Sequence, residues 1–69
     1  MIKAIKQTIA GKGIKYRYVA QQAGIPYKSF SAAMNGRRRI TVEELVKISQ
    51  VLEVPVDTLL EGVIGHDNA

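Results

Sequence analysis

The sequence predicts an all-α fold, a compact bundle of five short helices in one domain, and three observations support this prediction. Apolar residues recur at three- and four-residue spacing in short segments, and no segment alternates apolar and polar residues as a strand would. Glycine and proline separate these segments where helices would end and begin. The chain has 69 residues and no cysteine, so it suffices for one small domain without disulfides or thiolate metal sites.

The first two helices are predicted in the N-terminal part of the chain. A helical spacing of isoleucines ends at residues 11–13, which read Gly-Lys-Gly, and a second helix is expected over Tyr16–Ala23. Gly24 would end this helix in the left-handed conformation, which favours a residue without a Cβ atom. The residues expected to face the core are Ile2, Ile5, Ile9, Val19, Ala20 and Ala23.

The third helix is expected over about residues 26–35. Pro26 suits its first turn, because proline has a fixed φ and no amide hydrogen that needs a partner. The pair Asn35-Gly36 is expected to end it. The residues expected to face the core are Phe30, Ala33 and Met34.

The last two helices have the clearest boundaries. Thr41 and Glu44 have the spacing of a capping box, in which each side chain accepts a hydrogen bond from the other residue's amide. Pro55 is expected to begin a short fifth helix that ends at Gly62. The expected core residues are Leu45, Ile48, Leu52, Leu59 and Leu60. The expected organisation is a domain over residues 1–62 and a tail over residues 63–69.

The two parts of the chain carry charges of opposite sign. Of the ten Lys and Arg residues, all but Lys47 come before Thr41, whereas all six Asp and Glu residues follow it. A solvated surface normally mixes both signs, so this separation indicates a polyanionic partner for the basic part. An uneven surface with no partner is the alternative, but the long acid-free stretch favours the first interpretation.

Some of the basic residues lie where a helix tolerates them least. A helix start carries a partial positive charge, so acids stabilise it and bases do not. Lys15 and Arg17 nevertheless flank the start of the second predicted helix, and Lys28 lies in the first turn of the third. A phosphate group at each start would turn this repulsion into attraction. The alternative is that these basic side chains simply point into water. This would explain a base at one of the two helix starts more readily than bases at both.

The segment around the predicted turn resembles a known family. The segment has a small residue where two helices would cross, then a glycine at the turn, then an apolar residue. A Leu-x-x-Ile-x-x-x-Leu-x-Val run follows later in the chain. This pattern resembles the phage Cro/repressor type of helix-turn-helix regulator over about residues 2–61. The residues that carry the resemblance are Ala20, Gly24, Ile25, Phe30, Gly36, Leu45, Ile48, Leu52 and Val54.

The resemblance implies a lambda-repressor-like domain with a helix-turn-helix over residues 16–35. The third helix of this domain, over about residues 26–35, would lie in the major groove. The residues that would face bases are Tyr27, Lys28, Ser31 and Ala32. The residues that would contact phosphates are Lys15, Tyr16, Arg17, Asn35, Arg37, Arg38 and Arg39. Lys28 suits guanine O6 and N7, whereas the methyl group of Ala32 can only meet a thymine methyl or leave space at the base.

Four positions depart from the family pattern. Tyr16 stands where the family usually has a glutamine, and Pro26 where a hydroxyl cap is common. Met34 stands where an acid is common, and Ile40 where a proline is common. These departures leave the expected fold unchanged but weaken any transfer of base specificity.

Nothing in the sequence indicates catalysis. The single histidine, His66, has no partner placed near it, and the basic part has no carboxylate that could act as acid, base or metal ligand. We therefore expect no enzyme, no metal, no cofactor and no small-molecule ligand. The apolar stretches are far shorter than a membrane span and no leader pattern opens the sequence, so we expect a cytoplasmic protein without a membrane partner.

The expected function is that of a sequence-specific transcriptional regulator that binds double-stranded DNA and represses by covering an operator. A domain this small makes few base contacts, so we expect a homodimer on a near-palindrome, with the fifth helix and Val63-Ile64 as its contact surface. The alternative is a protein-interaction module, such as the antitoxin half of a toxin–antitoxin pair, whose acidic second part would face a protein partner.

Overall fold

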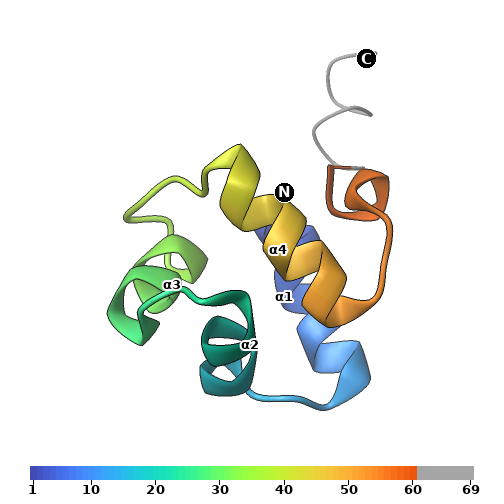
Figure 1. Ribbon diagram of the computed structural model, residues 1–69, viewed down its shortest axis with the longest axis horizontal. Coiled ribbons are helices and arrows are strands. Elements are labelled where there is room, and N and C mark those ends of the chain that lie inside the picture. The colour runs from blue at the N-terminus through green and yellow to red at the C-terminus, as the bar shows by residue number, and fades with distance from the viewer. Residues whose placement is uncertain (61–69) are drawn as a thin grey trace.

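The computed structural model describes residues 1–60, and this part of the chain is all-α, as predicted (Figure 1). A helical segment also covers residues 56–60 after Pro55, where the fifth helix was expected. The predicted helix end at Gly62, the predicted tail over residues 63–69 and the pair Val63-Ile64 lie outside the described residues. The other helices are α1 (Ile2–Lys12), α2 (Tyr16–Ala23), α3 (Tyr27–Met34) and α4 (Val42–Leu52).

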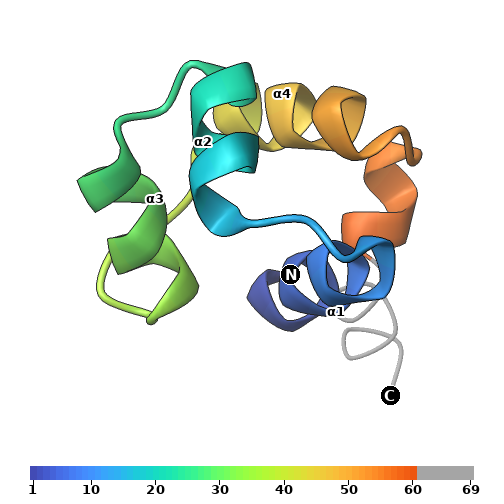
Figure 2. The same ribbon diagram turned by 90° about the horizontal axis from the view of Figure 1, so that it is seen from below.

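The helices enclose a single core. α2 packs against both α4 and α3, and α3 also contacts α1. Figure 2 shows α1 on the side of the molecule opposite α2 and α4, with α3 at one end. The largest fully buried side chains come from all four helices and the 56–60 segment, and they are Phe30, Ile5, Ile9, Met34, Ile48, Leu52, Leu59 and Val19.

The predicted core residues are buried with two exceptions. Ile2 and Leu60 are only half-buried and pack against the edge of the core. Met34 is buried, as its spacing from Phe30 predicted. One polar residue, Ser49, is also buried, which was not predicted. Its hydroxyl donates a hydrogen bond to the Val46 carbonyl at 2.6 Å and is thereby satisfied.

The helices begin and end near the residues predicted to bound them, with two differences. Gly13 and Gly24 end α1 and α2 in the left-handed region, at φ values of 68° and 73°. Pro26 lies just before α3 as its N-cap rather than as its first helical residue, because its ψ of 137° is extended. Glu53 ends α4 at a φ of 57°, a conformation in which glycine would have been expected.

Candidate nucleic-acid interface

The turn between α2 and α3 brings two helix starts to the same part of the molecule. Ala20 and Ile25 are buried on either side of Gly24, and the Ile25 amide donates a hydrogen bond to the Ala20 carbonyl at 2.9 Å. This bond is one of the two that close a helix end of this type, so the chain turns sharply and enters α3 at once. Ala20 is buried on α2, which packs against α3, and this agrees with the small residue predicted there.

The starts of α2 and α3 are open in the free protein. Neither helix has a side-chain hydrogen bond at its N-cap or an acidic residue in its first turn. Lys15 is the N-cap of α2 and has the extended backbone of a capping residue, but its side chain has no acceptor to offer. Lys15, Arg17 and Lys28 are all exposed. Backbone amides that lack partners therefore lie beside bases at both starts.

An aromatic contact connects these two starts. The Arg17 guanidinium carbon lies 4.4 Å from the centre of the Tyr27 ring, which is within the range of a cation–π interaction. The Tyr27 side chain remains 40% exposed, so it can still reach a partner. This pair could not be predicted from the sequence, because the contact depends on how α2 and α3 cross and no residue spacing encodes that crossing.

Tyr16 has a different environment from the other residues predicted to contact phosphates. Its ring packs edge-on against Phe30, with ring centres 5.7 Å apart and an interplanar angle of 75°. Tyr16 is half-buried and packs against the core, so its ring serves the fold. A phosphate contact through its hydroxyl stays a prediction.

The residues predicted to read bases share one side of α3. Positions 27, 28, 31 and 32 repeat at helical spacing, so they form one stripe along this eight-residue helix. Tyr27 and Lys28 in its first turn are exposed, whereas Ser31 and Ala32 are half-buried. Tyr27 and Lys28 are therefore the two residues of this stripe that are most accessible to a partner. Asn35, the C-cap of α3, is exposed beyond the stripe.

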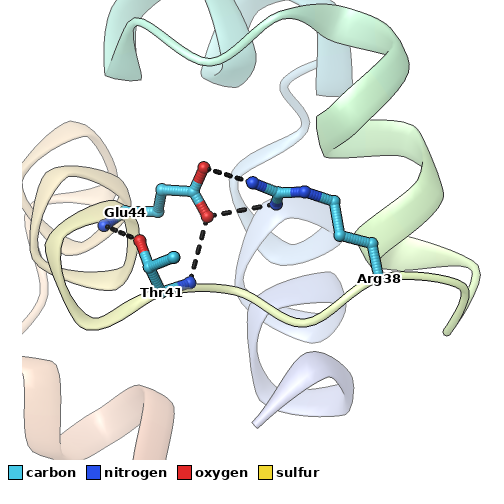
Figure 3. Close-up of polar contacts among 3 residues, drawn as sticks. All are labelled: Arg38, Thr41 and Glu44. Atoms are coloured by element: carbon cyan, nitrogen blue, oxygen red, sulfur yellow. Dashed lines mark hydrogen bonds and ion pairs between the residues drawn. The ribbon is translucent and has the colours of Figure 1, made fainter.

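The loop after α3 carries the three predicted arginines, and they differ in their partners. Arg37 and Arg39 are exposed. Arg38 instead forms a bidentate ion pair with Glu44, in which the two nitrogen–oxygen distances are 3.1 and 2.7 Å (Figure 3). The hydrogen bonds from Arg38, followed by that from the Thr41 amide, lower the pKa of the Glu44 carboxyl group below its usual value.

Residues 4–63 match the family described as the Cro/C1-type HTH DNA-binding domain. The chain belongs to this family. No curated protein and no solved structure was found to match it.

Membership in the Cro/C1-type family agrees with the helix-turn-helix formed by α2 and α3, and it assigns DNA as the partner. The family is not enzymatic, and its match covers nearly the whole chain. Within residues 1–60 no helix is long and apolar enough to cross a membrane. The same part of this Cro/C1-type chain has no cluster of three or more His, Asp or Glu side chains that could hold a metal ion.

Proposed function

We propose that this protein is a sequence-specific transcriptional regulator that binds its operator with α3 in the major groove and represses by covering it. The observation that carries the proposal is the pair of open helix starts at α2 and α3, which lie beside exposed bases. Phosphates at these starts would satisfy backbone amides and neutralise the bases at the same time. A site of this kind on a helix-turn-helix is what orients a recognition helix on DNA.

The proposed contacts fall into two groups. Contacts to bases come from one stripe of α3, where Lys28 supplies the main hydrogen-bond donor for a guanine. Contacts to phosphates supply most of the affinity and none of the sequence preference. The proposed base contacts are Tyr27, Lys28, Ser31 and Ala32. The proposed phosphate contacts are Lys15, Tyr16, Arg17, Asn35, Arg37 and Arg39, and Arg38 is treated separately below.

The proposed regulator acts as a homodimer on DNA. The base-reading stripe is short, and two half-sites read together give the specificity that one copy lacks. The predicted dimer surface consists of the fifth helix, of which residues 56–60 are described, and Val63-Ile64, which lie outside the described residues. DNA as the partner supports a protein that works inside the cell, and we propose the cytoplasm as its location.

Selection of bound duplexes from a random DNA pool tests the proposal. We expect one enriched motif with two related half-sites, and their spacing would give the dimer geometry. Lys28→Ala should relax the preference at one position of each half-site and reduce binding by about 1–3 kcal/mol. A pool without any enriched motif would contradict sequence-specific regulation, and a stoichiometric protein partner that blocks DNA binding would favour an interaction module.

A further inference from the structure

The loop between α3 and α4 presents three consecutive arginines in two different environments. Arg37 and Arg39 are exposed, whereas the Arg38 side chain is only 33% exposed. Its Nη1 donates to Glu44 Oε1 at 3.1 Å and its Nη2 to Glu44 Oε2 at 2.7 Å (Figure 3). Two parallel bonds between a planar guanidinium group and a carboxylate are the strongest arrangement for this pair.

Glu44 is held in place independently of Arg38. Its Oε1 also accepts a hydrogen bond from the Thr41 amide at 3.0 Å, and the Thr41 hydroxyl accepts one from the Glu44 amide at 3.1 Å. These two bonds form the capping box of α4. Arg38 is therefore attached to the fixed start of a core helix and not to a freely moving side chain.

The backbone around Arg38 has few other attachments. The Arg37 amide donates to the Ala32 carbonyl at 2.8 Å, and the next bond between backbone groups runs from the Leu45 amide to the Thr41 carbonyl at 2.9 Å. Across the loop, which lies wholly in the described part of the chain, the amides of residues 38–40 donate no hydrogen bond to the backbone. Ile40 packs against the core, so the Arg38–Glu44 pair is the polar attachment of this segment.

We propose that Arg38 is a positioning residue: its pair with Glu44 fixes the loop so that Arg37 and Arg39 reach DNA phosphates, and Arg38 contacts no phosphate itself. The proposal rests on the DNA binding proposed above, and it differs from the sequence-based prediction that all three arginines contact phosphates. A move of Arg38 to a phosphate would leave the Glu44 carboxylate unpaired beside a polyanion. The Arg38–Glu44 pair would thus be exchanged for an Arg38–phosphate pair, and the freed Glu44 carboxylate would repel the DNA.

The salt dependence of binding to a labelled random-sequence duplex separates the two roles. Each phosphate contact adds about 0.9 to the slope of log affinity against log salt concentration. Over about 50 to 200 mM salt, Arg37→Ala and Arg39→Ala should each make this slope shallower by about 0.9. Arg38→Ala should leave the slope unchanged and reduce affinity on the order of tenfold at every salt concentration, as expected for loss of an orienting group.

A double-mutant cycle with Glu44→Gln provides a second readout. Glutamine keeps an acceptor for the Thr41 amide but removes the charge that attracts Arg38. If Arg38 acts through Glu44, then Arg38→Ala should reduce DNA affinity less in the Glu44→Gln protein than in the original protein. Circular dichroism at the binding temperature establishes that every variant is folded.

Three results would overturn the inference. A slope about 0.9 shallower in Arg38→Ala, or an equal effect of this substitution in both backgrounds, would mean a direct phosphate contact. An unchanged affinity in folded Arg38→Ala protein would limit the pair to stability. The slopes are measured on random-sequence DNA, so a failed motif selection would contradict the specific regulator without changing them, and the two proposals fail separately.

Discussion

The starts of α2 and α3 differ from the start of α4 in how their backbone amides are satisfied. At α4, Thr41 and Glu44 cap each other's amides at 3.1 and 3.0 Å, and both Glu43 and Glu44 lie in the first turn. At α2 and α3 no side chain caps the helix and no acid is present. The chain thus caps the start of α4 with its own side chains, whereas the starts of α2 and α3, like that of α1, have no side-chain cap.

This difference separates the requirements of the fold from those of binding. A helix start that faces solvent is most stable with an acid and a capping hydroxyl, which α4 has. Lys15 and Lys28 at the other two starts lower the stability of the free protein, by a few tenths of a kcal/mol up to about 1 kcal/mol each. DNA phosphates would reverse the sign of that contribution. Substitutions that make one kind of start resemble the other should therefore change stability and binding in opposite directions.

The largest effect is expected when the start of α2 is given the properties of α4. In Lys15→Asp the new carboxylate can cap the helix, so the free energy of unfolding should rise by about 1 kcal/mol. DNA binding should weaken by about 2 kcal/mol or more, since a hydrogen bond to a charged group is worth about 1.5–3 kcal/mol and a repulsion is added. Urea unfolding and titration of a labelled duplex measure the two changes.

Two controls make this result specific. Lys15→Asn adds a capping side chain without an acid, so it should keep most of the gain in stability and lose less affinity than Lys15→Asp. Lys47→Ala removes an exposed base from α4, away from the open starts, and should leave DNA binding unchanged. If Lys15→Asp destabilised the protein, or if it bound DNA as well as the original protein, the proposed role of the open start would be wrong.

A smaller effect is expected when the start of α4 is opened. Thr41→Ala removes the hydroxyl that accepts from the Glu44 amide, and loss of such a cap costs about 1 kcal/mol of stability. DNA affinity per folded molecule should change little, because the backbone amide of residue 41 remains and still holds the Glu44 carboxylate that pairs with Arg38. Thermal unfolding and binding well below the unfolding midpoint test both statements. Thr41→Ser retains the hydroxyl and should behave like the original protein, and a large loss of binding in folded Thr41→Ala would contradict the comparison.

The contrast between the helix starts also explains which features the sequence could reveal. The capping box of α4 joins residues three positions apart, so its spacing alone predicts it. Gly24 and Ile25 are equally local, because the turn requires a left-handed residue followed by an apolar one. The bases near the starts of α2 and α3 were visible because they oppose the helix dipole.

The features that could not be predicted depend on how separate elements meet. The contact between Arg17 and Tyr27 requires a particular crossing of α2 and α3. The Arg38–Glu44 pair requires the loop after α3 to fold back on α4, and a run of three arginines gives no sign of which one will turn inward. The residues of the candidate interface could therefore be proposed from the sequence, whereas the pairing of Arg38 with Glu44 could be found only in the structure.

The smallest effect is expected from acid, and it too distinguishes the two kinds of helix start. Hydrogen bonds from Arg38 and the Thr41 amide lower the pKa of Glu44 in the folded protein below its usual value of 4.5. The carboxylate therefore stabilises the fold above about pH 4.5, and this contribution is lost as the pH falls through the lowered pKa. The difference in unfolding free energy between the original protein and Glu44→Gln should be constant near neutral pH and shrink in acid. The other carboxyl groups titrate in both proteins and cancel in the comparison.

Lys15→Asn provides the control at the other kind of helix start. It should shift stability by the same amount at every pH, because the start of α2 has no carboxylate to protonate. A Glu44→Gln difference that stays constant in acid would show that the ionised carboxylate does not stabilise α4, and the cap would then depend on neutral hydrogen bonds alone.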